Sequence, residues 1–179
     1  MATGQRHDPL LGYNFVVSLI DTSSILALAA SALFPAVSDA PAGGFSECSG
    51  LEMALDVEEY KEGGNNGAIL KFPTRVKWTD ITLKRGVATS TDLWDWHYGF
   101  VEGRGKRRDG IIMLQTDLRV PNNIWYWRRG LPIKYTGPSL NATQNSVAVE
   151  TIVIAHEGIY QVSSGGLAAS AANAVAGLF

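Results

Sequence analysis

The sequence predicts a mainly β domain with one helix, and three observations point to this fold class. Apolar residues recur at every second position in several segments, and turn-forming Gly, Asn and Pro residues separate these segments. One further segment has apolar residues at helical spacing. With 179 residues, the chain is long enough to bury its own core without metal or disulfide crosslinks. We expect a single domain over residues 1–179.

Composition excludes several classes of protein. Fifteen basic residues face 17 acidic ones, a formal net charge of -2, so nothing favours nucleic acid or an anionic membrane as partner. Cys48 is the only cysteine, which excludes an intrachain disulfide and fits a reducing cytoplasm. The N-terminus lacks the pattern of a secretory signal. The most apolar run, residues 25–34, is shorter than the ~20 residues that span a bilayer, so we expect no stable membrane insertion.

The first strand is expected over residues 13–20, where large apolar side chains recur on one face. An apolar insertion, residues 23–42, follows it. Within this insertion the Ala- and Leu-rich run 25–34 predicts a short helix that ends before Pro35. This helix has almost no polar face, so we expect either the sheet or a neighbouring subunit to cover it.

The clearest alternation in the chain is the stretch from Leu51 to Val57, where every second residue is apolar. The intervening acidic residues Glu52, Asp56 and Glu58 indicate a solvated strand face. A catalytic carboxyl pair is the less favoured interpretation, because such a pair needs a partly dry pocket to raise a pKa.

The next segment, KEGGNNGA over residues 61–68, is rich in Gly and Asn and predicts an exposed hairpin loop. A strand pair is expected within residues 70–86. Pro73 is expected near a strand start or a sheet edge, where its missing N–H group is tolerated.

The helix is expected from Leu93 to Val101, after a Thr-Ser-Thr sequence that can cap it. A basic turn, residues 103–110, precedes a strand over residues 111–118. An aromatic strand then leads into a proline-bounded loop that ends near Pro138. Its two tryptophans, Trp125 and Trp127, share a face and are better explained by packing than by stacking on nucleic acid.

One nearly unbroken strand is expected between Ser139 and Gly158. Apolar groups lie on both of its faces: Val149 is on one, and Ile152 and Ile154 are on the other. Such a strand is either central in a sandwich or shared between the core and a neighbouring subunit. The Ala-rich tail, residues 163–179, could form a helix with a small apolar stripe, which would be marginal on its own.

No catalytic, cofactor or metal site is predicted. The three histidines, His7, His97 and His156, have no metal-ligand spacing, and no GxSxG motif offers a nucleophile. The dipeptide His156-Glu157 is interpreted as a polar pair at a strand end. A hydrolase that uses this pair is a remote alternative.

Five phrases, in this order and spacing, resemble the inner-tube proteins of contractile phage tails and of related contractile injection systems. The resemblance covers about residues 11–162, and this family is related to the haemolysin-coregulated tube protein of type VI secretion. The phrases are GFSECSGLEMALDVEEYKEGGNNG, RVKWTDITLKRGVATSTDLWDW, DGIIMLQTD, LPIKYTGPSLNA and VAVETIVIAHEG. The insertion 23–42 and the tail 163–179 depart from the family pattern.

The resemblance implies two packed antiparallel β-sheets, forming a sandwich or barrel with one flanking helix. Six subunits would form a ring around a continuous β-barrel lumen, with 51–57 and 147–155 among its strands. The implied inter-ring loop comprises Glu62, Gly63, Gly64, Asn65, Asn66 and Gly67. The implied lumen-lining residues are Glu52, Asp56 and Glu58, and the implied subunit-interface residues are Leu26, Leu28, Leu33, Phe34, Val149, Ile152 and Ile154.

The function that follows from the resemblance is structural and not enzymatic. Rings would stack into a tube inside a contractile sheath and conduct effector or DNA cargo. The expected partners are further copies of the chain, the sheath protein, baseplate or spike proteins and tube-terminating proteins. Assembly would take place in the bacterial cytoplasm, as part of a phage tail or of a released or anchored injection particle. The alternative is a monomeric ligand-binding β-barrel with a pocket near Trp125.

Overall fold

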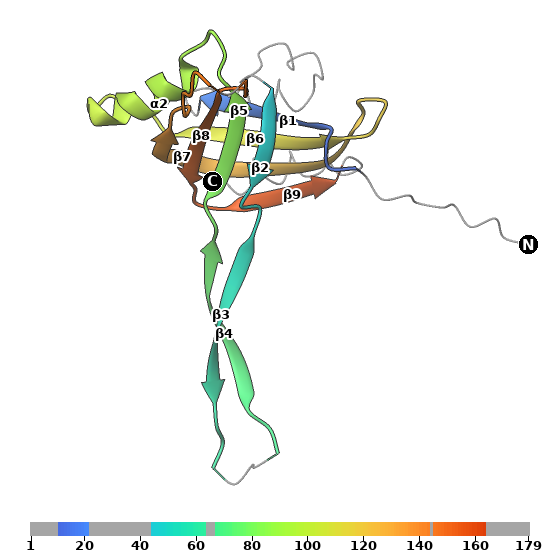
Figure 1. Cartoon of the computed structure of the whole chain (residues 1–179). Coiled ribbons are helices and arrows are strands. Elements are labelled where there is room, and N and C mark those ends of the chain that lie inside the picture. The colour runs from blue at the N-terminus through green and yellow to red at the C-terminus, as the bar shows by residue number, and fades with distance from the viewer. Residues whose placement is uncertain (1–10, 22–43, 64–66, 144, 164–179) are drawn as a thin grey trace, which may run out of the picture.

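The computed structural model describes residues 11–21, 44–63, 67–143 and 145–163. These residues form a β-sandwich with one flanking helix and a long projecting hairpin (Figure 1). The helix is α2 (Asp92–Val101). The strands are β1 (Phe15–Asp21), β2 (Phe45–Ser49), β3 (Met53–Tyr60), β4 (Leu70–Trp78), β5 (Ile81–Gly86), β6 (Arg108–Gln115), β7 (Pro121–Thr136), β8 (Val149–Ala155) and β9 (Ile159–Ser163).

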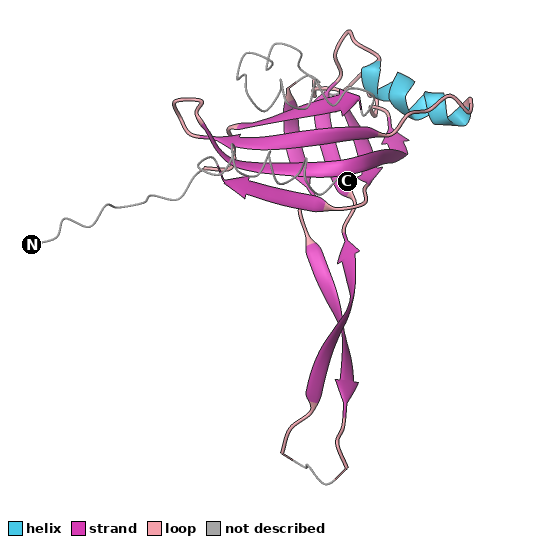
Figure 2. Cartoon of the chain, turned by 180° about the vertical axis from the view of Figure 1, so that it is seen from behind, coloured by secondary structure: helices cyan, strands magenta, loops and turns pink. Residues whose placement is uncertain are grey.

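Seven strands form the sandwich, in the order β1-β6-β7-β8-β5-β2, with β9 also paired to β7. All pairs are antiparallel. The first part of β7 pairs with β6 and β9, and its last part, from Leu131 to Thr136, pairs with β8. One strand therefore belongs to both layers, and Figure 2 shows the strands of one layer lying across those of the other. The predicted sandwich of two antiparallel sheets with one helix is confirmed.

The bend in β7 lies at Arg129 and Gly130. Arg129 has a φ of 51°, in the left-handed region, and the pairing register shifts on both sides of this point. Asp109 holds the bend, because its carboxylate accepts hydrogen bonds from the Arg129 N–H at 2.7 Å and from the Tyr126 hydroxyl at 2.6 Å. The sequence predicts that the aromatic strand gives way to a proline-bounded loop that ends near Pro138. The chain instead stays extended through Pro132, since the bend moves it from one sheet into the other.

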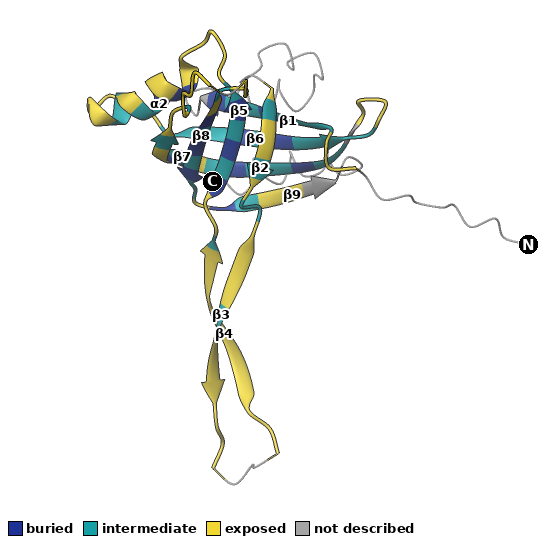
Figure 3. Ribbon diagram, in the orientation of Figure 1, coloured by how far each residue is buried: buried dark blue, intermediate teal, exposed yellow. Residues whose placement is uncertain are grey.

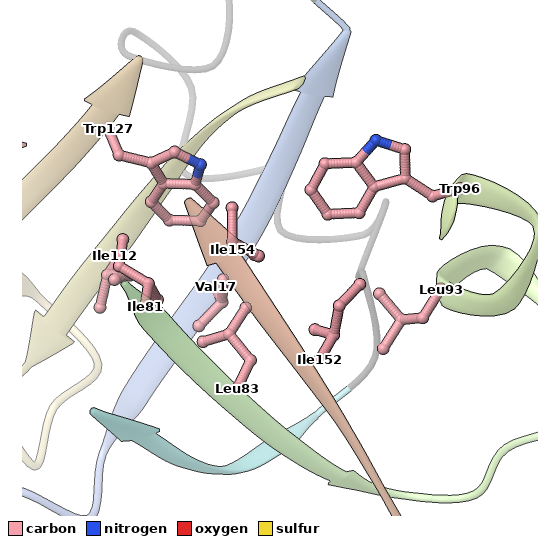
Figure 4. Close-up of a cluster of buried hydrophobic side chains, with 9 residues drawn as sticks. All are labelled: Val17, Ile81, Leu83, Leu93, Trp96, Ile112, Trp127, Ile152 and Ile154. Atoms are coloured by element: carbon pink, nitrogen blue, oxygen red, sulfur yellow. The ribbon is translucent and has the colours of Figure 1, made fainter. Parts of the chain in front are cut away.

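The core lies between the two layers. Figure 4 shows its buried side chains, contributed by both layers and by α2: Val17, Ile81, Leu83, Leu93, Trp96, Ile112, Trp127, Ile152 and Ile154. Trp127 is 0% exposed, which confirms that this aromatic residue packs and does not form a binding platform. The indole lies against the backbones of Gly110 and Gly130, where any Cβ atom would meet it within 2.7 Å.

A buried polar network accompanies this core. Arg85 and Glu150 are opposite each other on β5 and β8, are 1% and 5% exposed, and form an ion pair. The Tyr135 hydroxyl donates a hydrogen bond to the second carboxylate oxygen of Glu150 at 2.7 Å. Burial, reinforced by this hydrogen bond to a carboxylate, raises the pKa of Tyr135 to about 12. The phenol therefore stays neutral at physiological pH and keeps donating to Glu150.

The hairpin of β3 and β4 is a separate two-stranded sheet. It continues from β2 and returns into β5, and it extends well beyond the sandwich (Figure 1). The sequence interpretation places 51–57 among the barrel strands of the body and pairs the two strands of 70–86 with each other. In the structure β3 pairs with β4 alone, while β5 pairs with β2 and β8. The alternation in β3 is genuine, but alternation alone does not identify the partner strand.

Other boundaries also differ from prediction. The predicted helix is confirmed, whereas the strand expected from Ser139 starts only at Val149, and residues 137–143 and 145–148 belong to a loop. The short strands β2 and β9 are not predicted as separate elements. The insertion helix over 25–34 and the Ala-rich tail 164–179 lie outside the described residues.

We expect Gly110→Ala to destabilise the fold, because the new Cβ atom would lie 1.9 Å from the Trp127 ring. Overpacking of a core typically costs about 1–3 kcal/mol. Urea unfolding followed by tryptophan fluorescence measures the loss. Gly12→Ala is a useful comparison, since nothing lies within 4 Å of its added Cβ atom and its φ is outside the left-handed region. Equal stabilities of Gly110→Ala and the wild type would contradict the packing described here.

Candidate assembly surfaces

The hairpin exposes many large apolar side chains. Figure 3 shows both of its strands as exposed along almost their whole length. Met53, at its root, is 75% exposed, and the remaining exposed apolar residues of the two strands are Leu55, Val57, Tyr60, Leu70, Phe72 and Val76. A two-stranded hairpin is marginally stable in water by itself, and an exposed apolar ribbon is an association surface.

Strand pairing assigns these side chains to faces of the ribbon. In the root half, Leu55 is opposite Val76 and Met53 is opposite Trp78, so apolar groups share one face. The other face of this half carries Asp56 and Lys77, whose ion pair is 2.9 Å long. Residues that belong to the same face alternate along β3.

In the tip half the polarity of the two faces is reversed. Here Tyr60 is opposite Leu70, on the face that carries charges near the root. Glu59 and Lys71 are opposite each other on the remaining face and form an ion pair of 3.6 Å. Val57, opposite Pro73, is still on the face of Met53 and Leu55, so the exchange occurs between Val57 and Glu59.

Close backbone contacts fix the root of the hairpin to the sandwich. Gly50 has a φ of 90°, and a Cβ atom there would lie 2.1 Å from the carbonyl oxygen of Asp80. His156 bridges two turns: its Nε2 lies 3.0 Å from the Thr79 carbonyl oxygen, and its Nδ1 accepts the Gly158 N–H at 3.2 Å. A neutral ring with its proton on Nε2 satisfies both contacts. The predicted polar pair at the strand end thus includes an anchor for the hairpin.

The layer made by β2, β5, β8 and the end of β7 has two different faces. Ile152 and Ile154 lie on the inner face and are fully buried in the subunit's own core. Their predicted role at a subunit interface is therefore wrong, because the core of their own chain already covers them. The outer face is mainly polar, with Glu47, Ser49, Thr82, Lys84, Lys134, Thr136 and Thr151, and it also carries the apolar residues Leu131, Val149, Val153 and Ala155.

This outer face is nearly balanced in charge. Glu47 and Lys84 are opposite each other on β2 and β5 and form an ion pair of 2.8 Å. Thr82 and Thr151 contribute short hydroxyl side chains. The result is a hydrophilic sheet surface on the opposite side of the layer from the core.

Helix α2 packs on the sandwich through Leu93 and Trp96 and exposes aromatic residues on its other side. Trp94 and Tyr98, one turn apart, stack with ring centroids 5.8 Å apart. Asp92 and Asp95 lie in the first turn, where negative charge is favoured by the helix dipole. The exposed side of the helix is therefore aromatic and acidic.

The structure places the other predicted residues as follows. Glu62, Gly63 and Gly67 flank the end of the hairpin, while Gly64, Asn65 and Asn66 lie outside the described residues. The same is true of Leu26, Leu28, Leu33 and Phe34. Glu52, Asp56 and Glu58 are on or beside β3, in the hairpin and away from the body. Their predicted position in a lumen stays a prediction.

The described residues do not assemble a recognisable catalytic site. No group of three or more His, Cys, Asp or Glu residues among them could hold a metal ion. Burial raises the pKa of the Cys48 thiol to about 11, which makes it a poor nucleophile. The His97 ring is held by a hydrogen bond between its Nδ1 and the Pro132 carbonyl oxygen, 3.0 Å apart. Within the described part of the chain, no helix has the length and apolar character needed to cross a membrane.

A sandwich with a mainly polar sheet face and a projecting apolar hairpin is typical of a subunit that assembles with further protein chains. The model of the T4-like virus tail tube protein gp19 family matches residues 12–160. The chain belongs to this family and is a structural subunit of an inner tube. The comparison with curated proteins found no match.

Solved structures agree with this family. A chain in the sheath-tube complex of PVC, an extracellular contractile injection system, in its extended state is 27% identical, with a TM-score of 0.69 over 87% of this chain and 92% of that one. A chain in the PVC sheath/tube terminator structure is 26% identical, with a TM-score of 0.71 over 88% of this chain and 99% of that one. A chain of the anti-feeding prophage baseplate has the same fold, at 21% identity and a TM-score of 0.72 over 88% and 98% of the two chains.

We expect His156→Ala to loosen the hairpin root without unfolding the sandwich. The substitution removes both contacts of the imidazole, each worth about 0.5–1.5 kcal/mol. Hydrogen exchange by mass spectrometry should show faster exchange in β3 and β4, with little change in β6. His97→Ala is the matched control and should leave exchange in the hairpin unchanged. Unaltered hairpin exchange in His156→Ala would contradict the anchoring role.

Proposed function

We propose that this tube subunit forms six-membered rings, which stack into a hollow tube inside a contractile sheath. One observation carries the proposal: the layer of β2, β5, β8 and the end of β7 closes the core with one face and presents a mainly polar surface on the other. A polar face of this kind suits the wall of a water-filled channel. Its near balance of charge would let cargo pass without strong attachment.

Ring closure is supported by the edges of this layer. Among the described strands, β2 pairs only with β5, and the end of β7 pairs only with β8. Pairing of the β2 edge of one subunit with the β7 edge of the next would join six layers into one barrel. Closure would also protect backbone groups that an open edge leaves available for aggregation. The interface role of Leu26, Leu28, Leu33 and Phe34 remains part of this proposal.

The hairpin is the element that would connect successive rings. Its β3 strand alone has eight residues, so it spans about 26 Å at ~3.3 Å per residue. The loop at its end, with Glu62, Gly63 and Gly67, would then contact the adjacent ring. Glu52, Asp56 and Glu58 would line the lumen only where the hairpin itself contributes to the channel wall.

The outer side of α2 is the proposed contact with the sheath. Stacked Trp94 and Tyr98 offer a flat apolar surface, and the neighbouring Asp92 and Asp95 would attract a basic partner segment. The similarity to a chain from a sheath-tube complex supports a sheath as that partner. Baseplate or spike proteins and a terminating protein would contact the two ends of the tube.

We assign no catalytic activity to the chain, whose task would be mechanical. The sheath would supply the work, and the tube would transmit it as a rigid body while effector or DNA cargo occupies the lumen. Assembly would take place in the bacterial cytoplasm, for a phage tail or for a released or anchored particle. The alternative, a ligand-binding barrel with a pocket near Trp125, gains no support, because Trp125 packs against the core.

Purified protein should form rings or tubes visible by negative-stain electron microscopy, with sixfold symmetry in end-on views. The physical reason is that the open sheet edges and the apolar hairpin both lose solvent exposure on assembly. Light scattering across a dilution series measures the same equilibrium in solution. A protein that stays strictly monomeric at all concentrations would overturn the proposed function.

Tyr98→Ala should leave tube formation intact and weaken binding of the cognate sheath protein about tenfold, as expected for an aromatic contact worth above 1 kcal/mol. Co-sedimentation of assembled tubes with sheath protein measures the change. Tyr160→Ala, which removes a similarly exposed tyrosine on β9, serves as the control. Unchanged sheath binding by Tyr98→Ala tubes would exclude α2 as the contact.

A further inference from the structure

The hairpin is apolar on one side only, although its apolar residues switch faces halfway along. The root-half apolar face carries Leu55 and Val76, and the tip-half apolar face, which carries Tyr60 and Leu70, is the opposite one. Figures 1 and 2 show that the two strands exchange sides between root and tip, because the ribbon is strongly twisted. The apolar residues change from one face of the ribbon to the other, and the twist turns the ribbon over between root and tip. Because both changes occur, the apolar face of each half points in the same direction. Most of the apolar groups consequently follow one side of the projecting ribbon, with Glu58 among them, and the two ion pairs follow the other.

The sandwich has a second exposed apolar surface, at its opposite end. Strand β5 begins at the hairpin root and ends at Gly86, where it lies opposite Val149 of β8. The Val87 N–H donates to the Ala148 carbonyl at 2.9 Å, and Val147 lies against Gly86. Val147 is 80% exposed, and Val87 and Val149 are also exposed. These three valines form the valine patch.

The two surfaces lie at opposite ends of the same strand pair. A stack of identical subunits in one orientation brings the root end of each copy onto the patch end of the next. We propose that the valine patch of one copy receives the apolar side of the hairpin of the copy stacked on it. The inference rests on the proposed tube function and goes beyond it, because it assigns the receiving surface and the side of the hairpin that docks.

Neither surface is complementary to itself in this arrangement, which makes the contact heterologous. Met53, Leu55 and Val76 are the hairpin residues nearest the root and would therefore meet the valine patch. The ion pairs Asp56 with Lys77 and Glu59 with Lys71 would stay in water. A heterologous contact can be blocked from either side by a different substitution, and this property supplies the test.

The test uses Val147→Asp and Leu55→Asp, each of which places a charge in the contact. Each variant alone should form single rings and no long tubes. Pre-formed rings of the two variants, mixed in equal amounts, should give stacks of two rings and nothing longer. The intact hairpins of a Val147→Asp ring can dock on the intact patches of a Leu55→Asp ring. The two outer surfaces of that stack both carry the introduced charge, so no third ring can bind. Negative-stain microscopy counts the stack lengths. Leu118→Asp, at an 86% exposed leucine in the turn after β6, is the control and should form wild-type tubes.

The outcomes separate the two proposals. Failure of the wild type to form rings or tubes overturns the tube function and this inference with it. Wild-type tubes together with normal tubes from Val147→Asp overturn the docking site alone. Circular dichroism checks that each variant folds, and Val87→Asp takes the place of Val147→Asp if that variant does not. Two defective variants that fail to complement each other on mixing also overturn the inference.

Discussion

The structure depends on a single strand that serves two sheets. β7 pairs with β6 and β9 in its first part and with β8 in its last part, so both layers are connected through its bend. The bend requires a left-handed residue at Arg129, a carboxylate from Asp109 to hold it, and glycine at position 130. Trp127 fills the space that the glycines leave. Because the bend in β7 sets the position of both layers, it also determines which face of each layer points outward.

The body and the hairpin differ in what stabilises them. The sandwich buries a core that includes Ile81, Leu83 and Ile152, so it is stabilised by its own apolar contacts. The hairpin exposes most of its apolar side chains and is stabilised by backbone pairing and two surface ion pairs, which contribute little in water. A free subunit therefore carries one self-sufficient part and one part that gains stability only on association.

This division suits the proposed role of a tube that transmits force. A rigid sandwich keeps its shape whether or not partners are present, while the long ribbon is free to dock. The anchor at Gly50 and His156 sets the direction in which the ribbon leaves the body. Small errors in that direction would be amplified along the length of the hairpin, which gives a physical reason for the tight packing at its root.

Sequence by itself determined the fold class, the helix over 92–101 and the absence of a recognisable catalytic motif, because these depend on local periodicity and spacing. It also showed that the β8 strand has two apolar faces. Tertiary structure alone decided that Ile152 and Ile154 close the core, that β3 belongs to the projecting hairpin, and that β7 continues through its bend. The reason is that alternation defines two faces of a strand but carries no information on its partner, which is chosen by contacts between residues far apart in the chain.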